Sequence, residues 1–232
     1  MRSEDQQVAR SLPLFAEMDD EHFDSLMKVA YLQTFPPQVQ LITEGESADF
    51  LHVVVAGAVE LFARSNDRET TMALVQPVAT FILAAVLKDA VYLMSARTLA
   101  KSRILLIPSE NIRAVMDRDA AFARAMVDEL ASCYRAIVKA QKDLKLRTGV
   151  ERLANYLLRH HLAQGGNGLL TLDTDKRSLA SMLGMTPENL SRAFGALRPY
   201  GVDVNGAEIR LTKLAELEGL AKSNPLIDDP DI

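Results

Sequence analysis

The stretch Lys176-Arg-Ser-Leu-Ala-Ser-Met-Leu-Gly-Met-Thr-Pro-Glu-Asn-Leu-Ser-Arg-Ala-Phe-Gly195 decides the fold of the C-terminal part of the chain. Its pattern predicts two short helices joined by a tight turn. Ala180 supplies the small residue needed where two steeply crossed helices meet, and Gly184 suits a turn that requires a positive φ. Thr186 and Pro187 are a typical cap and first residue of a second helix. The segment is therefore predicted to be a helix-turn-helix.

The second of these helices has two different faces. Leu190, Phe194 and Leu197 share one face, and Glu188, Ser191, Arg192 and Gly195 share the opposite one. Arginine can bond guanine at two atoms, glutamate can accept from the cytosine amino group, and serine can bond either kind of base. We predict DNA contacts for Lys176, Arg177, Thr186, Glu188, Asn189, Ser191 and Arg192. The alternative is an ordinary helical hairpin with a charged outer face.

The residues that follow add a hairpin. Val202-Asp-Val-Asn-Gly-Ala-Glu-Ile-Arg-Leu211 reads as two alternating strands around Asn205-Gly206, a dipeptide that favours positive φ at both turn positions. A helix-turn-helix followed by a hairpin is a winged helix. The segment from residue 176 to 213 contains six basic and three acidic residues, so it carries +3 in a chain of net charge −5. A basic module on an acidic body indicates that one face of the protein meets DNA.

A helical pattern precedes the winged helix, from residue 109 to about 146. Within it apolar residues recur every four and three positions, as in the seam of a parallel dimer helix. The predicted seam is Met126, Leu130, Cys133, Ile137, Ala140 and Leu144. An amphipathic helix packed on its own domain is the alternative, although such helices usually have a wider apolar stripe. Gly149 would weaken a helix interior by about 1 kcal/mol relative to alanine and marks a hinge.

The N-terminal part has a different pattern. Residues 1 to about 30 look helical, with Asp19 as a cap, and residues 32–108 contain short apolar runs separated by turn residues. Such runs predict a small antiparallel roll, although residues 81–87 fit a buried strand or a short helix equally well. The predicted fold class is α+β. The expected domains are a sensor β-roll at 1–108, a dimerisation helix at 109–147, a winged helix-turn-helix at 148–222 and a tail at 223–232, in which residues 225–232 are expected to be frayed.

The composition limits the class of protein. The chain is 48% hydrophobic and 25% charged, and its one cysteine cannot form an intrachain disulfide or a cysteine-rich metal site. The N-terminus lacks the apolar core of a signal peptide, so we expect a soluble cytoplasmic protein. No nucleophile–base pair, metal-spaced cluster or phosphate loop is visible, so we expect neither an enzyme nor a metal site.

The whole chain resembles the superfamily of the cyclic-AMP receptor protein and the fumarate–nitrate regulator (CRP/FNR). The segment from Gly45-Glu46 to Gly57 is similar to the family's roll signature, and Glu151-Arg-Leu-Ala154 is similar to the start of its first DNA-domain helix. Glu188, Ser191 and Arg192 resemble the FNR and denitrification (DNR/NnrR-like) branch. The resemblance implies a homodimer on palindromic DNA, with half-sites about one helical turn apart, and RNA polymerase as a further partner.

The resemblance departs from the cyclic-AMP binders at the ligand. Those members hold the nucleotide with a Phe-Gly-Glu stretch and an Arg-Ser pair, where this chain has Phe81-Ile-Leu-Ala84 and Met94-Ser95, with Arg97 out of phase. A buried cyclic phosphate without a charge partner would be costly, which disfavours cyclic AMP. A regulator that responds to cyclic AMP stays the alternative. The N-terminal cysteine cluster of the iron–sulfur branch is absent, so no iron–sulfur cluster is expected.

The remaining prediction is an apolar effector pocket. Its predicted lining is Phe62, Phe81, Leu83, Val86 and Met94. Such a pocket resembles that of nitric-oxide and denitrification regulators, some of which bind haem. Haem iron needs an axial ligand, for which His22 and His52 are the candidates, with ordinary packed or surface histidines as the alternative. We therefore expect a DNA-binding regulator gated allosterically by a small-molecule, gas or haem effector, as opposed to a cyclic-nucleotide module without a DNA role.

Overall fold

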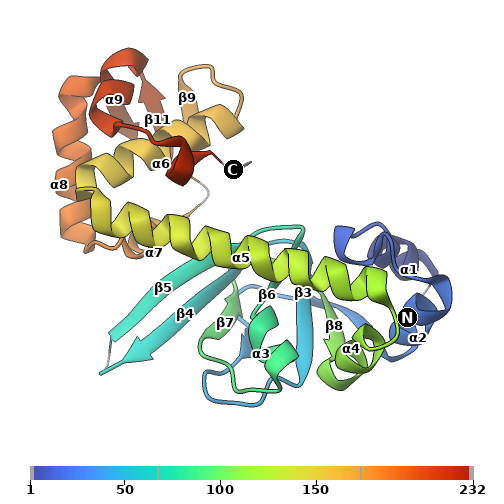
Figure 1. Cartoon of the computed structure of the whole chain (residues 1–232). Coiled ribbons are helices and arrows are strands. Elements are labelled where there is room, and N and C mark those ends of the chain that lie inside the picture. The colour runs from blue at the N-terminus through green and yellow to red at the C-terminus, as the bar shows by residue number, and fades with distance from the viewer. Residues whose placement is uncertain (1–2, 67, 173, 230–232) are drawn as a thin grey trace. The chain divides into compact units, whose positions relative to one another are not determined.

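The computed structural model describes residues 3–66, 68–172 and 174–229, and the chain forms two compact units that meet between Cys133 and Tyr134 (Figure 1). Helix α5 runs through this boundary. The elements of the N-terminal unit are α1 (Ser3–Arg10), η1 (Pro13–Phe15), α2 (Asp20–Val29), β1 (Tyr31–Phe35), β2 (Gln40–Ile42), β3 (Phe50–Ala56), β4 (Val59–Ser65), β5 (Arg68–Val75), β6 (Ala79–Phe81), α3 (Leu83–Lys88), β7 (Ser95–Thr98), β8 (Ser102–Pro108), α4 (Ser109–Met116) and the start of α5 (Ala120–Leu146).

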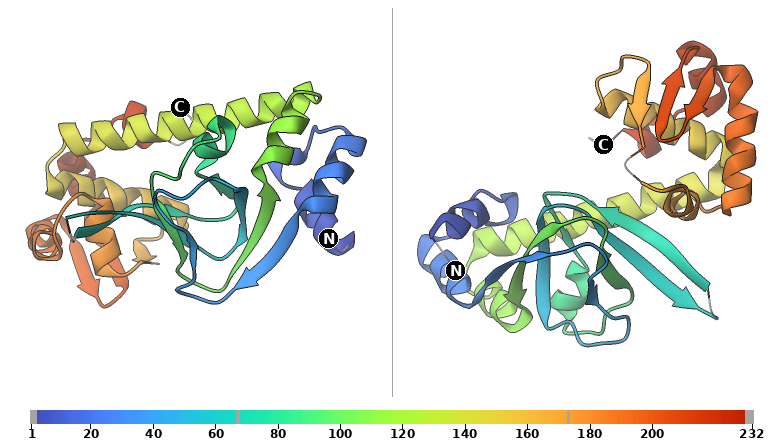
Figure 2. Two further views of the ribbon diagram at one scale, coloured as in Figure 1. Left: turned by 90° about the horizontal axis from the view of Figure 1, so that it is seen from below. Right: turned by 180° about the vertical axis from the view of Figure 1, so that it is seen from behind.

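The strands of this unit form the predicted roll. Two four-stranded antiparallel sheets have the orders β1-β8-β3-β6 and β2-β7-β4-β5, and β4 and β5 make a long hairpin (Figure 2). The central strands are continuous apolar runs because both of their faces are covered. Leu51, Val54, Ile104 and Leu105 are fully buried. Residues 81–87, which fit a strand or a helix, form the end of β6 and most of α3.

The expectation of one helix from residue 109 to 146 was wrong, because the segment is broken at residues 117–119. The Asp119 carboxylate accepts hydrogen bonds from the backbone N–H of Phe122 (2.9 Å), at the start of α5, and of Asp19 (2.9 Å), at the start of α2. Burial opposes ionisation of Asp119, but these two N–H groups and His22 hold its pKa below the usual value. Helix α4 packs on α2, α3 and β8, so it belongs to the roll.

The C-terminal unit contains the predicted winged helix. After the end of α5 its elements are α6 (Gly149–Ala163), β9 (Leu169–Thr171), α7 (Lys176–Met182), α8 (Pro187–Leu197), η2 (Arg198–Tyr200), β10 (Val202–Asn205), β11 (Glu208–Leu211), α9 (Leu214–Ala221) and α10 (Pro225–Asp228). The sheet order is β10-β11-β9, so β9 is a third strand that the sequence did not reveal. In the described residues no helix combines the length and apolar character of a membrane span.

The wing hairpin is confirmed, but its turn lies one residue later than expected. Asn205 pairs with Glu208, so the loop consists of Gly206 and Ala207, and Gly206 has a φ of +66°. A glycine at the first position of a two-residue loop is the pattern of a type II′ turn. Asn205 therefore serves as a strand residue instead of a turn residue.

The expectation of a frayed tail was wrong for the described residues up to Asp229. Asn224 caps the short helix α10 by accepting from the N–H of Leu226 at 2.9 Å. Ile227 is buried, and the Asp228 side chain is only 12% exposed because it pairs with Arg147 and Arg159. Residues 230–232 lie outside the described part.

Gly57 in the β3–β4 turn approaches a neighbouring segment closely, and Gly45, before β3, serves as a comparison. Gly57 has a φ of +92°, and a Cβ there would collide with the Ser102 side chain and lie 2.6 Å from the Lys101 carbonyl oxygen. Gly45 has a similar φ of +88°, but a Cβ there would meet nothing within 4 Å. We expect Gly45→Ala to cost the left-handed strain of about 1–2 kcal/mol, and Gly57→Ala to cost clearly more. Urea-unfolding midpoints measure both, and equal losses would contradict the close approach.

Candidate nucleic-acid interface

Helices α7 and α8 are positioned by caps and a tight turn. Asp175 caps α7 by accepting from the N–H groups of Arg177 and Ser178, and Thr186 caps α8 by accepting from the N–H of Asn189 at 3.3 Å. Gly184 sits in the turn with a φ of +62°, and a Cβ there would lie 2.5 Å from Leu144 Cδ2. The turn therefore favours glycine for its backbone conformation, and a larger residue there would also displace the end of the Leu144 side chain.

The predicted faces of α8 are confirmed. Leu190, Phe194 and Leu197 are buried in the core of the unit. All of the candidate DNA contacts are exposed, namely Lys176, Arg177, Thr186, Glu188, Asn189, Ser191 and Arg192. Their side chains thus stand on one surface, free to meet a partner.

The polar side chains of this surface also order one another. Arg192 Nη1 donates to Asn189 Oδ1 at 3.4 Å. A hydrogen bond from Thr186, together with the charge of Arg192, holds the pKa of Glu188 below its usual value, so this carboxylate is ionised at neutral pH. An ionised glutamate and an arginine one turn apart offer an acceptor and a bidentate donor to base edges.

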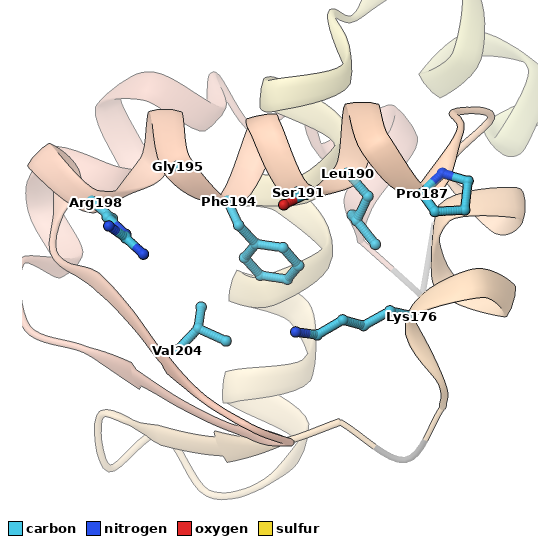
Figure 3. Close-up of a pocket in the computed structure, with 8 residues that line it drawn as sticks. All are labelled: Lys176, Pro187, Leu190, Ser191, Phe194, Gly195, Arg198 and Val204. Atoms are coloured by element: carbon cyan, nitrogen blue, oxygen red, sulfur yellow. The ribbon is translucent and has the colours of Figure 1, made fainter.

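A cleft of about 230 Å³ lies between α8, the first turn of α7 and strand β10 (Figure 3). Phe194 and Leu190 form its apolar floor, and the side chains of Lys176 and Arg198 point into it from opposite ends. In the described part of the chain neither cation has a hydrogen bond or ion pair. Two uncompensated cations beside the outward face of α8 suit a DNA phosphate.

Sequence reasoning missed Arg198 and Val204 as parts of this surface. Arg198 lies four residues after Phe194 and seven after Ser191, so helical spacing could have placed it on the same edge of α8. Val204 joins the cleft only through the wing fold, which brings β10 beside α8. No local pattern could have signalled that contact.

The predicted effector pocket is brought together only in part. Phe81, Leu83 and Val86 are buried in the core of the roll, and Met94 packs half-buried against the same core. Phe62 does not join them. Side chains alternate along a strand, so Leu61 faces the core while Phe62 faces the other side of β4, where the Arg97 guanidinium lies 4.3 Å from its ring centre.

Arg97 is already neutralised. Its guanidinium pairs with Glu60 Oε2 at 2.7 Å and Glu69 Oε1 at 2.9 Å, and Glu60 is buried. A buried carboxylate needs such a partner, so moving Arg97 away to bind an anion would leave Glu60 buried without a charge partner. The arginine nearest to the expected phosphate position is thus engaged elsewhere.

Of the two candidate histidines, His52 does not fit the role of a haem ligand as placed. His52 is enclosed by the rings of Phe81 and Tyr92, and its Nδ1 lies 3.1 Å from the Phe50 carbonyl oxygen. A porphyrin could not reach it without displacing those rings. His22 lies on α2, where its Nδ1 is 3.2 Å from Asp119 Oδ2. In the described residues no group of three potential metal ligands gathers.

The predicted dimer seam is wrong at its first position. Met126 is fully buried in the core of the N-terminal unit, and Leu130 packs against that core. Further along α5, Ile137 and Leu144 are 65% and 46% exposed, and Tyr134 and Val138 are exposed on an adjacent face. The regular spacing of the apolar residues could not show at which residue of α5 they stop packing on the roll and become exposed. Burial raises the pKa of the Cys133 thiol, which keeps it protonated.

Comparison with known proteins agrees with this architecture. A family model described as a cyclic nucleotide-binding domain matches residues 32–119, and a Crp-like helix-turn-helix domain matches residues 151–220. No curated protein sequence matches the chain.

Solved structures with the same fold cover nearly the whole chain. A regulatory protein from Silicibacter pomeroyi DSS-3, named for proposed cAMP binding, is 28% identical, with 96% of this chain and 100% of that chain covered and a TM-score of 0.60. FixK2 from Bradyrhizobium japonicum is 23% identical over 84% and 99% of the two chains, with a TM-score of 0.72. A crp/fnr-family protein from Eubacterium rectale is 17% identical over 91% and 99%, with a TM-score of 0.74. The first of these proteins is described as a regulatory protein and the third as a transcriptional regulator.

The burial of His52 predicts a pH dependence of stability. Burial lowers the pKa of His52 to about 4, from an ordinary value near 6.5. Between these values the unfolded chain binds a proton that the folded chain does not. Stability therefore falls as the pH drops from 6.5 to 4, by at most about 3 kcal/mol from this group.

The His52→Asn variant tests this prediction because its amide can still donate to the Phe50 carbonyl without titrating. Urea unfolding at several pH values from 7 to 4 should give a flatter stability curve for the variant than for the wild type. Parallel curves would mean that His52 ionises normally in the folded protein.

Proposed function

Because the chain belongs to the CRP/FNR superfamily of transcription regulators, we propose that it binds a palindromic operator as a homodimer, with one α8 in each of two successive major grooves. The observation that carries the proposal is the exposed row of Glu188, Ser191 and Arg192 on a capped helix. Lys176 and Arg198, which have no charge partner among the described residues, flank this row. Half-sites about one helical turn apart suit such a dimer.

The contacts divide into two kinds. Glu188, Ser191 and Arg192 stand where base edges would lie, and this set favours an operator of the FNR and denitrification type. Lys176, Arg177 and Arg198 flank the helix and would hold phosphates, which position the protein without reading sequence. The two kinds differ in the experiments that detect them.

The homodimer is supported by the outer surface of α5. Tyr134 and Ile137 lie three residues apart on α5 and are each at least 65% exposed, although large apolar side chains are seldom left side by side in water. A second copy of α5 would cover them. RNA polymerase is the partner we propose for activation, since a regulator bound at a promoter acts through it.

For the effector we favour a small apolar molecule or a gas such as nitric oxide. The apolar cluster of Phe81, Leu83, Val86 and Met94 supports this choice, and the pairing of Arg97 with two carboxylates disfavours a cyclic phosphate. The second candidate is cyclic AMP, which the name of the Silicibacter relative suggests. It would require Arg97 to leave Glu60, which is buried.

Arg192 tests the base-reading role of α8. We expect Arg192→Ala to cost about 1–3 kcal/mol of affinity for a selected operator and to relax specificity at one base pair of each half-site. The matched variant Arg192→Lys keeps the charge but not the two-atom contact, so it should lose the specificity while keeping the salt dependence. Binding of both variants is measured on operators changed at single positions. Unaltered base preference in both would remove Arg192 from the base-reading set.

Lys176 tests the phosphate contacts. We expect Lys176→Gln to weaken binding about equally on cognate and altered operators, and to lower the slope of log affinity against log salt by about 1 per protomer. Lys28→Gln, an exposed lysine on α2, is the control and should leave the slope unchanged. A slope that Lys176→Gln does not lower would place this lysine away from the DNA.

A further inference from the structure

Two buried arginines hold the joint between α5 and the DNA-reading helices. The first, Arg152 on α6, donates four hydrogen bonds to backbone carbonyl oxygens. Two of the acceptors lie at the end of α5: the carbonyl oxygen of Leu144 (3.4 Å) and that of Arg147, which directly follows the helix (2.7 Å). The other two are in the α7–α8 turn, at Leu183 (2.7 Å) and Gly184 (3.4 Å). Carbonyls at a helix C-terminus lack partners and carry partial negative charge, so one cation joins both segments.

The second arginine, Arg147, ties the same joint to the C-terminal segment. Its side chain is 6% exposed, and its two terminal nitrogens donate to the two carboxylate oxygens of Asp228 at 2.8 and 2.5 Å. Nη1 also donates to Asp143 at 2.8 Å. Asp228 accepts a further bond from Arg159 at 2.7 Å. Burial opposes the ionisation of Asp228, but Arg147 holds its pKa below the usual value, so the carboxylate is charged at neutral pH.

The C-terminal segment 224–229 lies along one face of α5. Lys139 Nζ donates to the Asp229 carbonyl oxygen at 2.6 Å, and Lys142 Nζ to that of Leu226 at 3.3 Å. With Asp143 and Arg147 these lysines follow the spacing of a single helix face. Ile137, Ala140 and Leu144 stay exposed beside this segment. The segment therefore leaves the proposed dimer surface uncovered.

We propose that segment 224–229 is a latch in which Asp228, acting through Arg147, fixes the orientation of the α7–α8 unit on the end of α5. The chain between α5 and α6 consists of Arg147 and Thr148, followed by Gly149, so the backbone alone restrains the joint weakly. The Asp228 carboxylate adds to the restraint that Arg152 supplies. Together with the proposed dimer, on which this role rests, the latch sets the distance between the two copies of α8, the recognition helix. Asp228 is thus a positioning residue that touches no DNA.

The experiment measures how strictly the full-length protein reads half-site spacing. Wild type, Asp228→Asn and Asp228→Glu are titrated with operators whose spacer is the preferred length, or one or two base pairs longer or shorter. We expect the wild type to lose affinity steeply away from the preferred spacer, and Asp228→Asn to reduce that discrimination by about fivefold or more. Base preference within each half-site should not change. Asp228→Glu, which keeps the charge, should restore most of the discrimination.

Glu218→Gln, which removes one exposed carboxylate on α9, is the control for the change of charge and should behave as the wild type. If Asp228→Asn does not fold, Arg147→Lys replaces it, because lysine keeps the charge but cannot make the two-atom contact with Asp228. Equal spacing discrimination in wild type and in the folded latch variant would overturn the latch and leave DNA binding intact.

A second readout does not depend on DNA. Amide hydrogen exchange at residues 147–150 should be at least several-fold faster in Asp228→Asn than in the wild type. If the wild type binds no palindromic DNA, the proposed function fails, and this exchange measurement alone decides whether the latch exists. Unchanged exchange would then overturn it.

Discussion

The structure depends on the compensation of buried cations at helix ends. Arg152 can be buried only because four backbone carbonyls accept from it, and those carbonyls belong to the end of α5 and to the turn before α8. Leaving a buried charge unpaired costs several kcal/mol, so these segments must stay together whenever the arginine stays buried. The orientation of the recognition helix therefore follows from the solvation of one guanidinium. Arg147 extends the same requirement to the C-terminal segment through Asp228.

The two units differ in whether their charged side chains are paired within the chain. In the roll, Arg97 is neutralised by Glu60 and Glu69, and Asp119 by backbone N–H groups. These charges are already paired with groups of the chain itself. On the α7–α8 surface Lys176 and Arg198 face a cleft without a partner among the described residues. Charges that the fold leaves unpaired on one surface are available to a partner, and a phosphate backbone has the matching charge.

The sequence predicted what short-range chemistry determines. Gly184, Thr186 and Pro187 specify the turn and the start of α8 through their own backbone preferences, so the turn, the cap and the exposed face of α8 were predictable. Features that depend on distant partners were not predictable. Met126 belongs to the seam row by spacing, but the roll covers it. Asp228 lies in a short acidic tail whose sequence resembles a frayed end, and only the tertiary fold shows that Arg147 and Arg159 receive it.

The shortened seam has a consequence for how such a protein can be switched. With Met126 buried and Leu130 packed on the roll, the outward row on α5 runs from Cys133 to Leu144. At 1.5 Å per residue this is about 16 Å, less than two heptads. A coiled coil that short is marginal on its own, because helical pairs of this length gain little beyond the cost of ordering them. A dimer built on it is therefore sensitive to small changes at either end of α5. The latch holds one end rigid, so an effector in the roll would act most directly through the other.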